Sequence, residues 1–361
     1  MSEIKSKTLN SNLTVLTKDT GWYGGHSGFY ERLGKILQGP PIQAKVTKPK
    51  KTLSRKLIGR LNSYRVGTPE RDAHVCSAEL EFFLRLRFLK DKYSCILNMD
   101  DHWPLLNYWN EVPRSLVGVI HLPTSQWTTE DSKWTTSSFE MCKKLRSAVV
   151  LWEREIPLIE QFVGAGRVAF VPHGIDTTFF HPGNEQREKM SFLSCGQYLR
   201  DFDMLQSAFL GIQEKHPESE LRIIIPKRFL EVIDLSWADR NTNVSIISGL
   251  SDEDLRSEYQ QATALLMPFT DSGANNAVME AMACGCPIVT NDVGGIRSYG
   301  GGSIYPVGED ANELVEIASK LIQDPAWAIE MSQKLRSYSQ TFEWDKVVDL
   351  FLSTTRQLAL E

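Results

Sequence analysis

The segment 266–295, LMPFTDSGANNAVMEAMACGCPIVTNDVGG, constrains the fold of this chain more than any other part of it. Two short apolar runs, residues 263–267 and 287–290, are separated by a glycine-containing loop and by a segment of good helix formers, residues 276–284. That segment lies behind a pair of asparagines suited to capping a helix. The order predicts a strand, a loop, a short helix and a second strand, which is a βαβ unit of the size that binds a nucleotide.

The predicted loop, residues 269–275, opens onto the N-terminus of the predicted helix. Free backbone N–H groups and the helix dipole favour an anion there, such as a diphosphate. Glu280 lies in the first turns of the same helix, and we interpret its carboxylate as an acceptor of hydrogen bonds from neutral hydroxyls, such as those of a ribose beside the diphosphate. The alternative is an acidic residue placed favourably near a helix N-terminus, with no ligand.

The run NAVMEAMACGCPIV followed by DVGG resembles the sugar-nucleotide-binding core of the family 4 retaining glycosyltransferases, glycosyl transferases group 1. The resemblance implies the GT-B fold, an α/β fold with two Rossmann-like domains facing each other across a cleft. In that family two glutamates eight positions apart flank the donor, and the second holds the ribose. Glu280 matches the second, while Ser272, next to Asp271, stands where the first would contact the transferred sugar.

The resemblance extends to the residues around these positions. It implies that Asp271 and Ser272 lie near the transferred sugar, where we class them as candidate catalytic residues. The loop and the start of the helix are expected to bind the donor. The residues with that expected role are Gly273, Asn275, Asn276, Ala277 and Glu280.

Residues 191–205, SFLSCGQYLRDFDML, resemble the first strand and loop of the donor domain, where the family usually sets an Arg and a Lys against the diphosphate. Gln197 stands where the Arg is expected, and Arg200 is the remaining cation of the loop. A guanidinium can bind two phosphate oxygens at once, so we predict that Arg200 binds the diphosphate. A solvated loop charge is the alternative. Residues 171–182, VPHGIDTTFFHP, are similar to the segment that leads into the second domain.

The N-terminal residues 13–37 repeat the strand, glycine loop and helix order, with the strand at 13–16 and the helix at 28–37. Gly24 and Gly25 in the loop allow the backbone to approach a ligand closely. The resemblance implies that this loop contacts the donor phosphates and the acceptor.

His121 follows the apolar run 116–120, at the carboxyl end of a predicted strand, where ligands bind in open α/β sheets. The resemblance implies that this histidine lies beside the transferred sugar, as a catalytic residue. Another apolar run, residues 95–99, is followed by three polar residues that could form part of an acceptor pocket. These are Asp100, Asp101 and His102.

Charge is divided unevenly along the chain, whose net charge is −5. Residues 1–180 hold 25 Lys and Arg against 18 Asp and Glu, whereas residues 181–361 hold 15 against 27. The positive excess is concentrated in residues 45–65, which carry eight cations and no acid. Apolar residues interleave there at helical spacing and predict a basic amphipathic helix for an anionic membrane surface, with a solvated basic segment as the alternative. They are Leu53, Leu57, Ile58 and Leu61.

The chain has 361 residues, which is enough for two domains with a core each. We predict an N-terminal acceptor-side domain at 1–175 and a nucleotide-sugar-binding domain at 176–342. By the resemblance, the helix at 343–361 packs back on the first domain. Further predicted elements are a helix at 78–92, strands at 221–225 and 244–247, and helices at 252–262 and 312–321.

Six cysteines without CxxC spacing indicate reduced thiols in a cytoplasmic protein with no zinc site. We see no signal peptide and no apolar run near the roughly 18 to 20 residues that span a bilayer. If the basic helix binds lipid, the protein is peripheral on the inner face of the membrane. We expect no nucleic acid partner.

The expected reaction is transfer of a sugar, with retention, from a UDP-sugar or next a GDP-sugar to a hydroxyl of a lipid or a growing glycan. No DxD is positioned for a divalent ion, so we expect no cofactor and metal-independent chemistry, in which N–H groups and cations stabilise the leaving diphosphate. Two alternatives stay open. A non-catalytic sugar-nucleotide-binding protein would suit Ser272, and a GT-B-fold epimerase would draw acid and base groups from Asp100, Asp101, His121 and His26.

Overall fold

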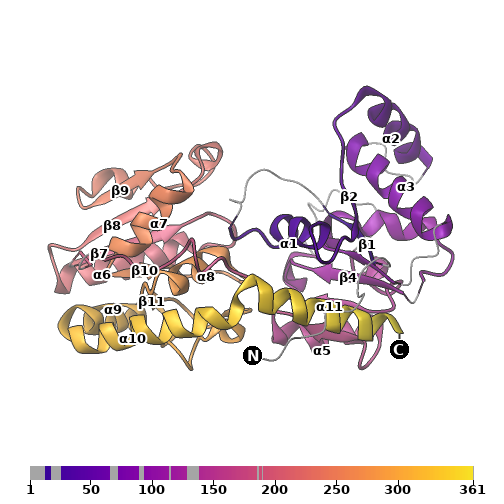
Figure 1. Ribbon diagram of the computed structural model, residues 1–361. Coiled ribbons are helices and arrows are strands. Elements are labelled where there is room, and N and C mark those ends of the chain that lie inside the picture. The colour runs from indigo at the N-terminus through magenta and orange to yellow at the C-terminus, as the bar shows by residue number, and fades with distance from the viewer. Residues whose placement is uncertain are drawn as a thin grey trace. The chain divides into compact units, whose positions relative to one another are not determined.

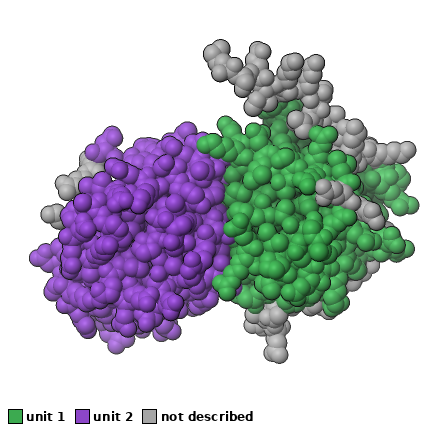
Figure 2. Space-filling view, turned by 90° about the horizontal axis from the view of Figure 1, so that it is seen from below, with its two compact units in different colours: residues 1–173, 345–361 green, residues 174–344 purple. Residues whose placement is uncertain are grey.

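The computed structural model describes residues 13–17, 26–65, 72–88, 93–113, 115–127, 138–184, 187–188 and 190–360 (Figure 1). Contacts divide the chain into two compact units (Figure 2). Unit 1 consists of residues 1–173 with 345–361, and unit 2 consists of residues 174–344. Each unit contains one parallel sheet with helices packed on it, which confirms the predicted α/β class with two Rossmann-like domains.

Unit 1 is built on a six-stranded parallel sheet of order β2-β1-β3-β4-β5-β6. Most of its strand residues are buried, as expected where helices cover a parallel sheet. The direction in which successive strands are added reverses between β1 and β3, and ligands of open α/β sheets bind at such a point, outside the carboxyl ends of the strands. The strands are β1 Leu13–Leu16, β2 Lys45–Thr47, β3 Tyr93–Ile96, β4 Leu116–Ile120, β5 Ala148–Val150 and β6 Val168–Phe170.

The helices of unit 1 pack around this sheet. Ala78 and Phe82 of α3 join Leu16, Ile96 and Ile120 of the sheet in one buried apolar cluster. The helices are α1 Phe29–Gln38, α2 Leu53–Arg65, α3 Ala73–Phe88, α4 Ser138–Cys142, α5 Ile156–Val163 and α11 Trp344–Leu360.

Apart from its first residue, Trp344, the last helix α11 belongs to unit 1 although it follows unit 2 in the sequence. The Ser147 hydroxyl, just before β5, donates a hydrogen bond of 2.9 Å to the carbonyl oxygen of Leu358. The ring of Phe351 lies 6.4 Å from that of Phe29 in α1. Both contacts attach α11 to the N-terminal sheet and its helices.

Two predicted boundaries in unit 1 were wrong. The basic segment 45–65 is not one helix, because Lys45 pairs with Thr14 as part of β2 and the helix begins only at Leu53. Pro49 lies between the two elements and disfavours helix for the residue before it. The helix predicted at 78–92 begins at Ala73, where Asp72 Oδ1 accepts hydrogen bonds from the backbone of the first turn.

Unit 2 contains a five-stranded parallel sheet of order β11-β10-β7-β8-β9. The direction reverses between β7 and β10, so right-handed crossovers place the intervening helices on opposite faces. The strands are β7 Ser191–Cys195, β8 Glu220–Ile224, β9 Val244–Ile247, β10 Ala264–Leu266 and β11 Ile288–Val289. The helices are α6 Phe202–Lys215, α7 Asp252–Gln261, α8 Asn276–Ala283, α9 Ala311–Gln323 and α10 Pro325–Ser339.

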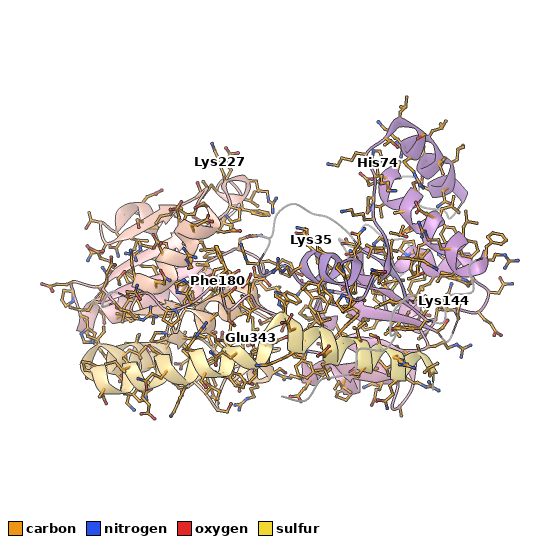
Figure 3. All side chains as sticks on the ribbon, viewed as in Figure 1. Lys35, His74, Lys144, Phe180, Lys227 and Glu343 are labelled. Carbon is orange, nitrogen blue, oxygen red and sulfur yellow. The ribbon has the colours of Figure 1, made fainter. Side chains whose placement is uncertain are left out.

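The strand, loop, helix and strand predicted from the 266–295 segment are confirmed as β10, α8 and β11. Helix α10 was not predicted, although Asp324 caps it by accepting a hydrogen bond from the Trp327 N–H. Before α11 lies Glu343, which is labelled in Figure 3. Its carboxylate accepts a hydrogen bond of 2.8 Å from the Thr177 hydroxyl.

The six cysteines all lie within the described residues, are buried and form no disulfide. Among the helices of the described part, none has the length and apolar character needed to cross a bilayer.

Candidate functional site

The loops after β7 and β10 pair with each other where the strand order of unit 2 reverses. The Asp201 N–H donates to the Pro268 carbonyl at 3.1 Å, and the Thr270 N–H donates to the Leu199 carbonyl at 3.0 Å. Leu199 has a φ of +57°, which is uncommon for a residue with a side chain and costs on the order of 1–3 kcal/mol. Such strain is found at ligand sites more often than elsewhere.

Arg200 is anchored at the end of β7. Its Nε donates to the Cys195 carbonyl and its Nη1 to the Tyr198 carbonyl, each at 2.8 Å. The guanidinium carbon lies 4.7 Å from the ring centroid of Phe269. A Cβ at Gly196, whose φ is +81°, would lie 2.9 Å from Nη2, so glycine leaves room for the guanidinium. The cation predicted to bind a diphosphate is therefore held at the carboxyl end of a central strand.

The side chain of Asn291 forms two hydrogen bonds with the backbone of the loop after β10. Its Oδ1 accepts from the Phe269 N–H and its Nδ2 donates to the Phe269 carbonyl, both at 2.8 Å and both buried. This residue was not predicted from the sequence, because the two partners lie 22 positions apart.

The side chains of Asp271 and Ser272 turn onto their own loop. Asp271 Oδ1 accepts from the Ser272 N–H at 2.7 Å, and the Ser272 hydroxyl donates to the Gly273 carbonyl at 3.0 Å. Ser272 is only 2% exposed. In this geometry its hydroxyl is occupied inside the loop rather than presented to a ligand.

The N-terminus of α8 begins as predicted. Asn275 is the N-cap, and its Oδ1 accepts from the N–H groups of Ala277 and Val278 at 3.1 and 3.4 Å. Asn276 follows as the first helical residue and is half-buried. The end of the helix that favours an anion thus opens beside the Asp271–Gly273 loop.

Glu280 lies further along α8 and is 6% exposed. Its Oε2 accepts a hydrogen bond of 2.9 Å from the hydroxyl of Tyr259, a fully buried residue of α7. Burial, followed by the nearby Cys195 and Glu280, raises the pKa of Tyr259 well above its usual value, so the phenol remains a donor. Tyr259 was not predicted from the sequence.

In unit 1, His121 follows β4 as predicted and its ring packs against aromatic residues of α1. Ring centroids of Phe29 and Tyr30 lie 5.2 and 5.4 Å away. The Nε2 atom lies 2.5 Å from the Leu97 carbonyl oxygen, which assigns the ring proton to Nε2. Burial lowers the pKa of His121 to about 4, so the imidazole is neutral at pH 7.

Asp100 connects the ends of β3 and β4. Its Oδ2 accepts from the N–H groups of His121 and Leu122 at 2.7 and 3.3 Å. Its Oδ1 is buried and has no hydrogen-bond partner among the described residues, and the same holds for Oδ1 of Asn98. Burial raises the pKa of Asp100 to about 7. Two buried acceptors thus lie near the carboxyl end of β3, one strand from His121.

His102 does not join this group. It is fully buried, and its Nδ1 lies 2.8 Å from Glu79 Oε1 of α3, which is also fully buried. Of the three residues predicted for an acceptor pocket, His102 is therefore bonded to α3, while Asp101 Oδ2 accepts from Asn98 Nδ2 at 3.0 Å. Gly24 and Gly25, predicted to contact the donor, lie outside the described residues.

Within unit 2 the structure thus brings together Arg200 and the 271–280 segment, which were predicted to bind the sugar donor. Within unit 1 it brings together His121 and Asp100. No group of three His, Cys, Asp or Glu side chains in the described ranges is arranged to hold a metal ion. Asp201 and Asp203 are spaced by one residue, but Asp201 caps α6 by accepting from the Met204 N–H at 2.8 Å.

Residues 191–324 match the model of the family described as Glycosyl transferases group 1. The matched residues all lie within unit 2. Among the relatives are D-inositol 3-phosphate glycosyltransferases of Corynebacterium urealyticum, 22% identical over 71% of this chain and 68% of that protein, and of Nocardiopsis dassonvillei, 22% identical over 53% of this chain and 50% of that protein. The chain spans about half the length of most of these curated relatives.

Solved structures with a similar fold cover nearly the whole chain. Sucrose-phosphate synthase of Thermosynechococcus elongatus superposes with a TM-score of 0.70 at 14% identity, covering 96% of this chain and 99% of that one. Anabaena HepE, in complex with UDP and glucose, gives a TM-score of 0.66 at 11% identity, covering 96% and 99%. The fold of this chain is therefore GT-B, and the resemblance that the sequence indicated is confirmed at the level of group 1.

Proposed function

We propose that the protein is a retaining glycosyltransferase that moves a sugar from a nucleotide diphosphate sugar to an acceptor hydroxyl. The observation that carries the proposal is the group of residues in unit 2 where the strand order reverses. Arg200 lies there at the end of β7, and the N-terminus of α8 and Glu280 follow β10. UDP is the favoured nucleotide, since the similar HepE structure contains UDP and glucose, and GDP is next.

The chemistry follows from the charge that develops on the leaving group. The departing diphosphate gains negative charge, which backbone N–H groups at the start of α8 and the Arg200 guanidinium are suited to stabilise. We propose that this occurs without a metal ion and that the leaving phosphate takes the proton of the acceptor hydroxyl. Activity should then persist in EDTA.

On the acceptor side we assign His121 and Asp100. Because the Nε2 proton of His121 is donated to the Leu97 carbonyl, the neutral imidazole offers Nδ1 as an acceptor to a hydroxyl group, and a protonated Asp100 carboxyl can donate. The same pair keeps the epimerase alternative open, because an acid and a base with pKa values moved apart by their surroundings are what proton transfer at a sugar carbon requires.

A panel of nucleotide sugars tests the function. Wild-type protein is first screened by thermal shift with UDP-, GDP-, ADP- and dTDP-glucose, since a ligand that binds only the folded state raises the melting temperature. The binding nucleotide sugar is then incubated with the protein, and the products are separated. Slow release of the nucleoside diphosphate supports a transferase, and a new nucleotide sugar supports the epimerase. Binding without either product supports the non-catalytic alternative.

We further propose that helices α2 and α3 bring unit 1 to an anionic membrane and that the acceptor is lipid-linked. Three leucines of α2, at spacings of four, are largely exposed: Leu53 by 85%, Leu57 by 64% and Leu61 by 67%. Burying such side chains in a bilayer is favourable, and the cations around them are attracted to anionic lipid.

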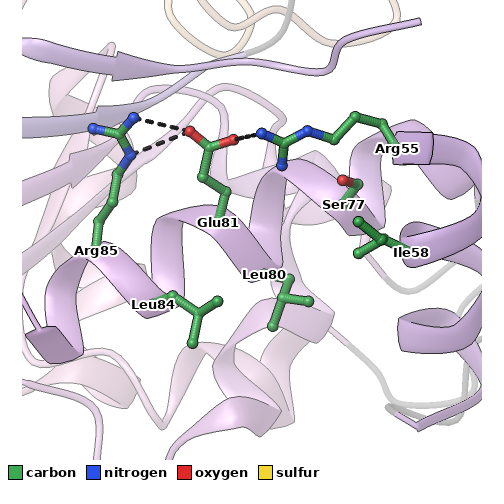
Figure 4. Close-up of a pocket in the computed structure, with 7 residues that line it drawn as sticks. All are labelled: Arg55, Ile58, Ser77, Leu80, Glu81, Leu84 and Arg85. Carbon is green, nitrogen blue, oxygen red and sulfur yellow. Dashed lines mark hydrogen bonds and ion pairs between the residues drawn. The ribbon is translucent and has the colours of Figure 1, made fainter. Parts of the chain in front are cut away.

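The two helices are packed closely. A Cβ at Gly59 would lie 1.5 Å from the carbonyl oxygen of Ala73, so the backbones meet only because residue 59 is glycine. Between them lies a pocket of about 500 Å³ in which Glu81 bridges Arg55 and Arg85, at 2.7 and 2.9 Å (Figure 4). The Arg55–Glu81 pair joins α2 to α3, whereas the Arg85–Glu81 pair lies within α3 and orients the Glu81 carboxylate. The exposed leucines lie four residues apart and so form one face of α2.

A further inference from the structure

A buried hydrogen bond joins two helices beneath the proposed donor site. The hydroxyl of Tyr259 on α7 donates to Oε2 of Glu280 on α8 at 2.9 Å. Tyr259 is fully buried and its ring packs edge-on against Phe180, with centroids 6.3 Å apart. Neither partner can exchange this contact for water without opening the interior.

The Tyr259 hydroxyl also interacts with the thiol of Cys195, the last residue of β7. The carbonyl of the same cysteine accepts the hydrogen bond that anchors Arg200. Cys195, Tyr259 and Glu280 therefore form a continuous buried line. It connects the end of β7, where the proposed diphosphate ligand Arg200 is held, to the carboxylate proposed to bind ribose.

We infer that Tyr259 is a positioning residue, which orients the Glu280 carboxylate toward the ribose of the donor. The inference rests on the proposed function and adds a residue to the same site. A glutamate side chain has many rotamers, and holding it in one of them before the ligand arrives reduces the entropy lost on binding. A carboxylate has about four lone-pair positions, so accepting from Tyr259 leaves it able to accept from ribose hydroxyls as well.

The test compares Tyr259→Phe with Tyr305→Phe. Both replacements remove one buried phenolic hydroxyl from unit 2 and keep the ring. The hydroxyl of Tyr305 has no hydrogen-bond partner among the described residues, whereas that of Tyr259 binds Glu280. Calorimetry measures the dissociation constants of UDP and of 2′,3′-dideoxy-UDP for the wild type and both variants, and circular dichroism checks that each is folded.

We expect the wild type to prefer UDP to the dideoxy analogue by about tenfold, since the analogue lacks the hydroxyls that would donate hydrogen bonds to the charged Glu280 carboxylate. Tyr259→Phe should bind UDP about fivefold or more weakly and the analogue unchanged, so that the preference falls toward one. Tyr305→Phe should keep the wild-type constants. In a Glu280→Gln background, Tyr259→Phe should have no further effect on the ratio.

The outcomes distinguish the positioning role of Tyr259 from the proposed donor site itself. A folded Tyr259→Phe that keeps the wild-type preference for UDP overturns the positioning role and leaves the donor site standing. An equal loss with Tyr305→Phe, or equal losses for UDP and its analogue, also overturns it, because the effect would then be structural. A wild type that binds neither UDP nor GDP overturns the proposed function together with this role.

Discussion

The backbone of Gly294 lies against the carbonyl oxygen of Ser272, so close that a Cβ at residue 294 would be 1.9 Å from that oxygen. Gly294 has a φ of +50°, and the N–H of the next residue, Gly295, donates to the same oxygen at 2.6 Å. The two glycines thus hold the loop that precedes α8. These contacts fix the backbone of the loop that forms part of the candidate site in unit 2.

Gly294→Ala should lower the free energy of unfolding of unit 2 by about 2–4 kcal/mol, because it combines a positive φ with a backbone clash. Gly249→Ala is the matched control. Its φ is +77° and nothing lies within 4 Å of its Cβ position, so only the backbone penalty of about 1–2 kcal/mol remains. Urea unfolding of both variants measures the difference. Equal losses would show that the contact with Ser272 is unimportant.

Arg200→Ala should weaken binding of UDP about tenfold or more and leave binding of uridine nearly unchanged, since a charged hydrogen bond contributes about 1.5–3 kcal/mol. Arg200→Lys keeps the charge but cannot reach the Cys195 and Tyr198 carbonyls and a phosphate in one fixed plane, so it should recover only part of the affinity. Calorimetry with both ligands is the measurement. Similar losses for UDP and uridine would place the action of Arg200 elsewhere.

Much of the fold follows from local signals. The apolar runs and the asparagine cap around 266–295 predict β10, α8 and β11, because each signal lies within a few residues of the element it marks. The predicted strands at 13–16, 116–120 and 244–247 coincide with β1, β4 and β9. The strand β2 was missed because it forms by pairing with β1, which is distant in sequence. Its own three residues, KVT, are too few to show a strand pattern.

In the candidate site, too, local sequence signals predict some features and miss those that depend on distant residues. The positions of Arg200 after β7 and of Glu280 within α8 were predictable, but the contacts of their side chains were not. Tyr259 meets Glu280 only because α7 packs on α8, and its one sequence signal is that it is the only aromatic residue of DEDLRSEYQQ. The backbone carbonyl of Ser272 lies against glycines 22 and 23 positions later, a relationship that its own neighbours in the sequence do not reveal.

Asp100→Asn should make the protein more stable than the wild type at pH 8 but not at pH 4. Burial raises the pKa of Asp100 from its usual 3.8 to about 7, so the folded state holds the proton more tightly than the unfolded state does. The stability contributed by this group is complete below about pH 4 and is lost as the pH rises through about 7. Asparagine can accept the same backbone hydrogen bonds and never ionises.

Melting temperatures at the two pH values measure this effect, and a gain of about 2–4 °C at pH 8 corresponds to about 1 kcal/mol. Asp349→Asn, which removes an exposed carboxylate from α11, is the control and should not reproduce the pH dependence. The assignment is wrong if Asp100→Asn changes the melting temperature equally at both pH values.

Binding to anionic vesicles should depend on the cations around α2. Replacing four exposed lysines with Gln should abolish sedimentation with phosphatidylserine-containing vesicles at low salt, because each contributes about 1 kcal/mol near the surface. Arg55 is left in place because it pairs with Glu81. The four are Lys48, Lys50, Lys51 and Lys56.

The control replaces four exposed lysines of unit 2 and changes the net charge equally, so it should still sediment. Binding of the wild type should weaken steeply with salt, since charges are screened over about 8–10 Å at physiological ionic strength. Equal losses in both variants, or a wild type that never sediments, would favour a soluble acceptor. The control lysines are Lys215, Lys227, Lys320 and Lys334.

Because α11 is synthesised last, unit 1 cannot be completed until after unit 2 has been made. Unit 2 is one uninterrupted stretch, residues 174–344, so a ribosome can release all of it before the last helix of unit 1 exists. Until residues 345–360 emerge, the Ser147 hydroxyl lacks the acceptor that Leu358 supplies, and Phe29 lacks the ring of Phe351. Unit 1, which comes first in the sequence, is therefore completed later than unit 2, and a nascent chain carries a finished unit 2 before it has a finished unit 1.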